Sequence, residues 1–298
     1  MGSSERNILK TLAYGDIFDY PLSQEEIWRF LILEEKISKK EFENDIKNIS
    51  KNITFKSNLY CLKGRERIID KRIKREKESL IKIKIAQKIA SIFSVIPTIY
   101  LIGVSGALAM KNSDKNDDID LFIIVKKGKL WVTRIILLIF LEISGNRRKR
   151  EDKNVSNKIC LNMFIDEHAI KMPKERQNLY SAHEVVQMLP LFQGNNMYSK
   201  FINVNKPWIE KFLPNSFEHV TTQNTTQNYS ESFFGLVLRK VLFNSAFEYL
   251  SKKIQMRSIK KHQTIETVSD QFLAFHPLEY RDVVIKEYNQ RLKEYKIL

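Results

Sequence analysis

The stretch 103–125, GVSGALAMKNSDKNDDIDLFIIV, constrains the fold more than any other part of the chain. An apolar run ends in a Gly and Ser turn, and Asp118 and Asp120 then stand at the head of a second apolar run. Residues two apart on a strand point to one face of a sheet, so these carboxylates repel each other unless a cation lies between them. Oxygen ligands favour a hard divalent ion, and we predict Mg²⁺ or Mn²⁺. The Gly turn beside the pair suits a triphosphate.

The composition is that of a globular chain with a basic surface. Of its 298 residues, 43% are hydrophobic and 29% charged, and the net charge is +15. This charge favours anionic partners such as nucleotides or nucleic acid, although a solvated basic surface explains it equally well. Cys61 and Cys160 lie in apolar runs typical of buried thiols in a reducing compartment. With no signal-peptide pattern and no bilayer-length apolar segment, we expect a cytoplasmic protein without a membrane partner.

Residues 1–64 have the pattern of a winged helix-turn-helix, in which three helical patterns precede a hairpin pattern over 53–62. The third helical pattern contains Glu41, Glu43 and Asp45 among its lysines. DNA reading is therefore one alternative, and docking or substrate presentation is favoured over it. A basic helix, placed at 65–96, is either a solvated bridge between domains or a contact for a phosphate backbone.

Residues 97–170 alternate between strand and helix patterns. The run from Asp118 to Val125 is apolar on both faces, which places it at the centre of a sheet. We expect a polar, flexible loop over 111–117, a buried helix over 129–143 and a strand over 158–166. Residues 171–298 are predicted to be a helical C-terminal region with an irregular segment over 214–229. Its helical patterns cover 176–189, 198–213, 231–261 and 278–295.

GVSGALAM followed by KNSDKNDDIDLFIIV resembles the motif of the nucleotidyltransferase fold superfamily, which includes polymerase beta, CCA-adding enzymes and kanamycin nucleotidyltransferase. The similarity covers residues 98–166, and the wider layout is similar to an uncharacterised prokaryotic group of MNT-type nucleotidyltransferase-domain proteins. The resemblance implies an α+β fold. This fold has a small mixed-sheet nucleotidyltransferase core, an N-terminal winged helix-turn-helix and a C-terminal helical region.

The resemblance also implies roles for particular residues. Asp118 and Asp120 would be the catalytic, metal-binding carboxylates. Candidates for the phosphate contacts are Ser105, Gly106, Ala107 and Lys127, and candidates for a third position beside the carboxylates are Asn162 and Glu184. The implied reaction transfers a nucleoside monophosphate, AMP from ATP, onto a hydroxyl of an unknown acceptor that is a small molecule, a protein or RNA.

Two positions differ from the family pattern. Ala107 stands where the family has Gly or Ser, and Asn162 stands where it has a carboxylate. An amide can ligate a metal through its oxygen but cannot take a proton. The alternative function is therefore a catalytically degraded regulator that senses a nucleotide and binds nucleic acid.

Overall fold

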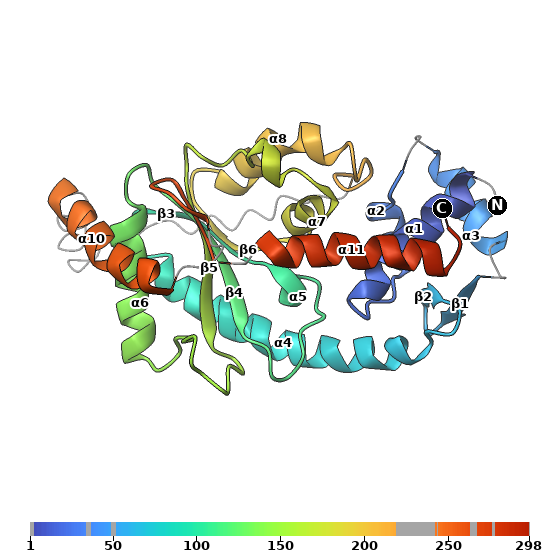
Figure 1. Cartoon of the computed structure of the whole chain (residues 1–298), viewed down its shortest axis with the longest axis horizontal. Coiled ribbons are helices and arrows are strands. Elements are labelled where there is room, and N and C mark those ends of the chain that lie inside the picture. Colours follow the sequence, from blue (N-terminus) through green and yellow to red (C-terminus); the bar gives the residue numbers. More distant parts are fainter. Residues whose placement is uncertain are drawn as a thin grey trace.

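A six-stranded mixed sheet forms the centre of the molecule, with strand order β6-β3-β4-β5-β8-β7 (Figure 1). The computed structural model describes residues 3–33, 37–48, 52–218, 242, 244–262, 267–275 and 278–297. Strands β4 and β5 are parallel, and the other neighbouring pairs are antiparallel. The prediction of an α+β fold with a mixed sheet is confirmed. The strands are β3 Ile99–Val104, β4 Ile119–Val125, β5 Ile159–Asp166, β6 Leu189–Gln193, β7 Thr267–Val268 and β8 Phe272–Ala274.

Strands β6, β7 and β8 come from the region predicted to be helical, so that prediction was wrong. The helix expected over 176–189 is shorter, and the chain turns to an extended conformation at Met188 before β6. Short apolar runs such as LPLFQ and FLA fit a helix and a strand equally well, and only their pairing partners decide. The region's helices are α7 Leu179–Gln187, α8 Met197–Ile209, α10 Ser245–His262 and α11 Leu278–Glu294. Residues 219–241, within the irregular segment and helix expected there, lie outside the described residues.

Two hydrophobic cores lie on opposite faces of the sheet. On β4, Leu121, Ile123 and Val125 pack into one core, and Phe122 and Ile124 pack into the other. The first core is shared with α4 Arg67–Phe93, α6 Leu130–Ile143 and α10. The second is shared with α7, α8 and the N-terminal helices. The prediction that this strand is buried on both faces is therefore confirmed.

The N-terminal region consists of three helices and a hairpin, which lie beside the sheet at one end of the molecule (Figure 1). Ser23 and Glu26 form the capping box that begins the second helix. The predicted hairpin over 53–62 is confirmed, because its two strands pair antiparallel. The assignment as a winged helix-turn-helix stays a prediction. These elements are α1 Ser3–Ile17, α2 Gln24–Arg29, α3 Lys39–Asn48, β1 Ile53–Lys56 and β2 Leu59–Leu62.

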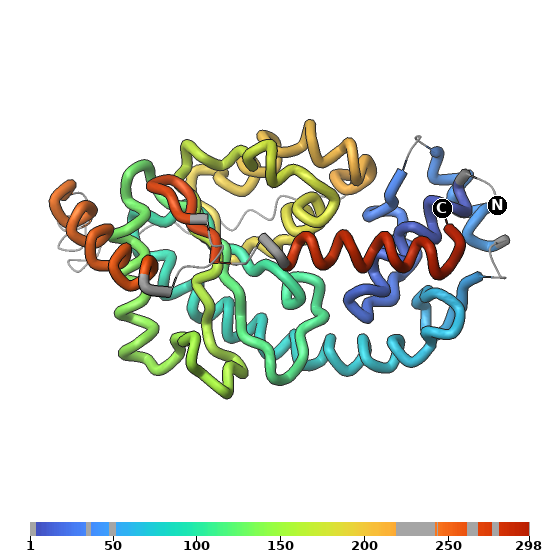
Figure 2. The backbone as a smooth tube through the Cα atoms, in the orientation of Figure 1, coloured from blue at the N-terminus to red at the C-terminus, as the bar shows by residue number. Residues whose placement is uncertain are grey.

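Ion pairs bind the N-terminal region to the rest of the chain. The buried carboxylate of Asp16 on α1 pairs with Arg65 at 2.5 Å and with Arg291 on α11 at 2.7 Å. Helix α11 packs against α1 and α7, so the end of the chain returns to its beginning (Figure 2). Arg72 on α4 pairs with Glu26 in the same way. The basic start of α4 thus bridges two parts of the fold, which favours that alternative over a phosphate-backbone contact.

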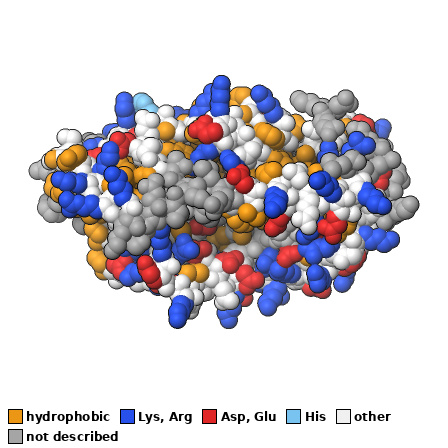
Figure 3. All heavy atoms as spheres, in the orientation of Figure 1, with side chains coloured by type: hydrophobic (Ala, Val, Ile, Leu, Met, Phe, Trp, Pro, Cys, Tyr) orange, Lys and Arg blue, Asp and Glu red, His pale blue; other side chains and the backbone are white. Residues whose placement is uncertain are grey.

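On one face of the molecule the charged side chains are mixed in sign (Figure 3). On the face shown in Figure 3, Lys and Arg side chains are spread out with Asp and Glu among them. No helix in the described part of the chain is long and apolar enough to cross a membrane.

Candidate functional site

The Gly turn and the Asp-Ile-Asp segment lie side by side because β3 and β4 are antiparallel neighbours. The turn follows the end of β3, where the Ser105 amide donates to the backbone oxygen of Asp120 at 3.1 Å. Gly106 has φ +65°, a conformation that glycine adopts without strain. It begins the short helix α5, Gly106–Ala109. A methyl group at Gly106 would come within 3.7 Å of Asp120 Oδ2, so the turn adjoins this carboxylate directly.

The carboxylates of Asp118 and Asp120 repel each other. Burial raises the pKa of Asp118, and the negative charge of Asp120 raises it further. Arg148 opposes this shift through an ion pair of 2.8 Å between its Nε and Asp118 Oδ2. A pair of carboxylates that hinder each other's ionisation is an arrangement that a divalent cation stabilises.

Cys160 completes this cluster, and sequence reasoning missed its position. It lies opposite Asp120 in the parallel register of β4 and β5. One ligand atom each of Asp118, Asp120 and Cys160 lie within 4.8 Å of one another. Burial, followed by the charge of Asp120, raises the pKa of the Cys160 thiol well above its usual value, so the thiol is neutral. The two carboxylates suit Mg²⁺ or Mn²⁺, whereas sulfur is a ligand for softer metals.

The two candidates for the third position lie around a small cavity. Asn162 lies at the register shift between β4 and β5, where Leu161 and Met163 pair with consecutive residues of β4. It lines a cavity of about 80 Å³ together with Ser105 and Glu184. The Ser105 hydroxyl is buried there without a hydrogen-bond partner. The structure brings Asn162 and Glu184 near the Gly turn, and their roles as third ligand or base stay predictions.

Lys127 does not belong to the site, which corrects its assignment as a phosphate ligand. It follows the far end of β4, roughly 20 Å from Asp120 along the strand. Its backbone amide donates to Glu167 Oε1 at 3.0 Å. The prediction failed because a turn lysine was placed by sequence proximity, whereas β4 carries it away from the carboxylates.

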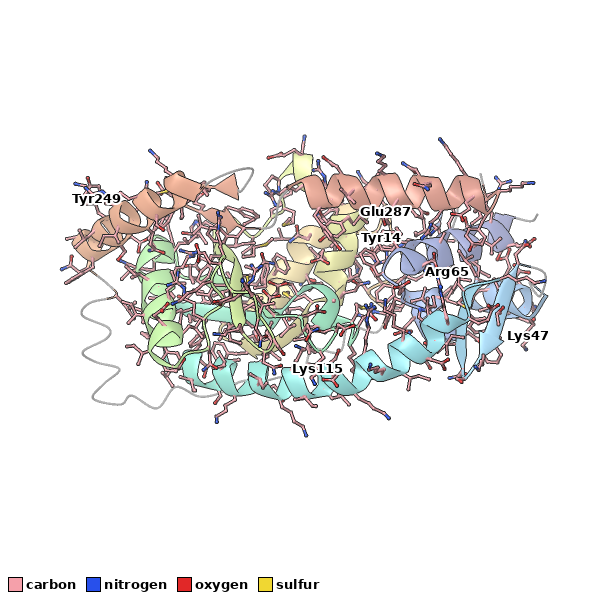
Figure 4. The ribbon with its side chains drawn as sticks, turned by 60° about the horizontal axis from the view of Figure 1, so that its bottom comes forward. Tyr14, Lys47, Arg65, Lys115, Tyr249 and Glu287 are labelled. Carbon is pink, nitrogen blue, oxygen red and sulfur yellow. The ribbon has the colours of Figure 1, made fainter. Side chains whose placement is uncertain are left out.

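The loop over 111–117, expected to be flexible, is held against α4 by hydrogen bonds. The buried ammonium group of Lys82 donates to the backbone oxygens of Lys115 at 3.1 Å and Asp117 at 2.6 Å. Ser79 Oγ accepts from the Ser113 amide at 3.0 Å. Figure 4 shows Lys115 beside the middle of α4. These bonds fix the backbone that leads into Asp118.

A larger cavity adjoins the turn on the side of the N-terminal helices, and we name it the aromatic chamber. It has a volume of about 230 Å³. Gly106, Ala107 and Asp120 line it together with six Phe and Tyr side chains and several polar and aliphatic residues. The aromatic and polar side chains that line it include Tyr14, Phe30, Tyr180, His183, Glu184 and Tyr280. Tyr14 lies beneath α11 in Figure 4, where α1, α7 and α11 approach one another.

A second hollow adjoins the carboxylates on the side of α6, and we name it the basic groove. Cys160 and several cationic residues line it together with Glu142 and Glu151. Burial lowers the pKa of Arg134 to about 10, and its guanidinium donates to Gln255 Oε1 at 2.7 Å. The cationic residues are Arg134, Arg147, Arg148, Lys149 and Arg150.

Comparisons of this chain with protein-family models, curated proteins and solved structures find no match.

Proposed function

We propose that this protein is a metal-dependent nucleotidyltransferase that transfers a nucleoside monophosphate, AMP from ATP, onto a hydroxyl group. The observation that carries the proposal is the convergence of Asp118 and Asp120 beside a glycine turn with a positive φ. The two carboxylates alone would suit many cations. Together with a turn at which only glycine avoids strain, they suit a cation bridged to a phosphate.

The carboxylate pair fits Mg²⁺ or Mn²⁺ on chemical grounds. Burial and Asp120 together raise the pKa of Asp118, so the folded chain holds negative charge that a cation would relieve. When bound, such an ion supplies charge neutralisation at the phosphates and lowers the barrier to displacement there. Asp118 and Asp120 would hold it, and Arg148 adds a fixed positive charge beside Asp118.

The remaining chemistry requires positioning by the chain itself. The acceptor oxygen attacks the α-phosphorus and forms a new P–O bond, while the bond from the α-phosphorus to the bridging oxygen breaks. Pyrophosphate leaves with that electron pair, and the acceptor proton passes to solvent, with Glu184 as the candidate base that relays it. Gly106 allows the backbone to approach the phosphates closely because it carries no side chain. Ser105 has a buried hydroxyl without a hydrogen-bond partner, and this hydroxyl would donate to a phosphate oxygen.

The test is nucleotide turnover by the purified chain. We would incubate it with each α-labelled ribonucleoside triphosphate and with Mg²⁺ or Mn²⁺, with and without tRNA, and measure pyrophosphate release and labelled product. Asp118→Ala and Asp120→Ala should each lower turnover by at least about 100-fold, because each removes a group that positions charge in the transition state.

Asp70→Asn is the matched control, because Asp70 is an exposed acidic residue on α4. It should leave turnover unchanged. If no triphosphate is turned over and the wild-type chain instead binds nucleic acid with a strong salt dependence, the regulatory alternative replaces this proposal.

A further inference from the structure

The basic groove contains a guanidinium group that pairs with no carboxylate among the described residues. Arg134 on α6 donates from Nη1 to Gln255 Oε1 at 2.7 Å, and its guanidinium lies over the Phe275 ring, 4.4 Å from the ring centroid. Both partners are uncharged. Its Nε is buried and has no hydrogen-bond partner. A cation held in this way keeps its charge without a counter-ion, which is costly in a folded chain.

Neighbouring cations add to this positive charge. Burial and then the charge of Arg147 lower the pKa of Arg134 to about 10. Arg147 and Lys149 pair with Glu142 at 3.0 and 2.5 Å, so one carboxylate serves two cations. Glu142 and Glu151 are the acidic residues that line the groove, against five cationic ones. The groove therefore has a net positive charge that a bound anion would stabilise.

The groove is roomy and adjoins the carboxylate pair. Its volume is about 710 Å³, compared with about 230 Å³ for the aromatic chamber. Helices α6 and α10 pack against each other and form its walls together with β5 (Figure 1). Cys160, which lies opposite Asp120, and Arg148, which pairs with Asp118, both line it. Apolar side chains of both helices line it as well, and reduced contact with water strengthens the attraction between its cations and an anion.

We propose that the basic groove binds a phosphate group and that Arg134 is the cation that anchors it. A guanidinium presents a planar fork of N–H donors that matches the oxygens of a phosphate. The phosphate is either part of the nucleotide itself, beyond the reacting phosphorus, or part of a separate phosphorylated acceptor. The role of the groove in transfer rests on the proposed function, whereas its affinity for phosphate does not.

Inorganic pyrophosphate is the probe that tests this site. Titration calorimetry on the full chain, with a chelator and at constant ionic strength, should show binding with a dissociation constant below about 1 mM. Arg134→Met should weaken this binding at least about tenfold, because it removes a charged hydrogen-bond donor. Arg134→Lys should weaken it about threefold, because the charge remains but the planar fork is lost.

Two positions on α10 provide the controls. Arg257 is an exposed arginine that does not line the groove, so Arg257→Met should change pyrophosphate affinity by less than about twofold. Ser258 is also exposed but lines the groove, so Ser258→Asp should weaken binding about fivefold by adding a negative charge there. Ser258→Asn, which adds no charge, should not. This exposed pair preserves the test if Arg134→Met does not fold.

A second titration identifies the source of the phosphate. If α,β-methylene-ATP bound with Mg²⁺ displaces pyrophosphate, the groove holds phosphates of the nucleotide; if both bind together, it holds a phosphate of a separate molecule. Either result supports the site. No pyrophosphate binding by the wild-type chain, or equal weakening by Arg134→Met and Arg257→Met, overturns the inference even if Asp118→Ala abolishes turnover. The predicted variant effects support it whether or not any triphosphate is turned over.

Discussion

The aromatic chamber and the basic groove adjoin the same carboxylate pair but have opposite electrostatic character. The chamber is lined by Asp120, Glu184 and aromatic rings, and the groove is lined by five cationic residues together with Glu142 and Glu151. Arg148 extends from the groove to Asp118. A cationic groove attracts the phosphates of a nucleotide more strongly than the chamber does.

The two cavities also differ in how the chain builds them. The groove is assembled from α6, the segment after it, β5 and α10. The chamber combines α1, α5, α7 and α11, which are widely separated in the sequence. Its shape therefore depends on the docking of the N-terminal region, whereas the carboxylate pair depends on the sheet. Variants that disturb the docking of the N-terminal region but not the sheet, or the reverse, therefore show whether the two cavities are independent.

The largest expected effect comes from Asp16→Asn. The Asp16 side chain is 1% exposed and pairs with Arg65 and Arg291, which tie α1 to the start of α4 and to α11. Loss of the charge removes the buried partner of both guanidinium groups and leaves Arg65 with Asp19 and Arg291 with Glu294, which should lower the free energy of unfolding by about 3 kcal/mol. Urea denaturation measures this loss. Mn²⁺ affinity should be unchanged, because the carboxylate pair depends on the sheet. A loss of Mn²⁺ binding in the folded variant would show that the two regions are not independent.

His183→Phe should change how stability depends on pH. The folded pKa of His183 is about 3, below its ordinary value of 6.5. Below pH 6.5 the unfolded chain therefore takes up a proton that the folded chain refuses, and stability falls as the pH falls. Between pH 6.5 and pH 5 the wild-type chain should lose about 2 kcal/mol more than the variant, as measured by urea denaturation at each pH.

Arg134→Met provides the control for that experiment on the groove side. The pKa of Arg134 is about 10, so its charge does not change between pH 5 and pH 6.5. This variant should follow the pH dependence of the wild-type chain. A parallel pH dependence in His183→Phe would mean that His183 is not held neutral by burial.

Arg148→Gln should raise the affinity for Mn²⁺ about threefold to tenfold. Its guanidinium occupies Asp118 Oδ2 at 2.8 Å, so a metal ion must compete with it for that oxygen. Calorimetric titration with Mn²⁺ measures the change, and Arg147→Gln is the matched control because Arg147 pairs with Glu142 instead. Turnover should fall in Arg148→Gln, because the phosphates lose a fixed positive charge. Weaker Mn²⁺ binding would show that Arg148 supports the metal site and does not compete for it.

Asp118→Asn should have the smallest effect on stability. Whether the variant is more or less stable shows whether repulsion by Asp120 or attraction by Arg148 is the stronger effect. The folded pKa of Asp118 is raised, so stability is lost as the pH rises through that pKa and the carboxylate ionises. In the presence of a chelator at pH 7, the amide should raise the melting temperature by about 1–2 °C, because it removes the repulsion by Asp120. The gain is small because the Asp118 side chain is partly exposed and the ion pair with Arg148 is lost. Mg²⁺ should stabilise the wild-type chain and leave the variant unaffected. A lower melting temperature in the variant would mean that Arg148 outweighs the repulsion by Asp120.

Local patterns in the sequence were sufficient for the strand at 119–125, the hairpin over 53–62 and the position of the Gly turn beside Asp120. In each case neighbouring residues contain the whole signal: an apolar run on both faces, a turn between two short runs, and glycine before a second strand. The same local signals misled at Leu189–Gln193, because a short apolar run does not reveal whether it pairs with a strand. They also misled at Lys127, because sequence proximity to Asp120 is not proximity along a strand.

The amino-acid sequence by itself thus determined a central strand with a pair of carboxylates at its head, and the family resemblance implied the mixed sheet around it. Only the tertiary structure placed Cys160 opposite Asp120, since a strand register depends on the partner strand. It alone also assembled the aromatic chamber, whose walls include Tyr14, His183 and Tyr280. Packing brings such distant residues together through the burial of several helix faces at once, and no local pattern contains that information.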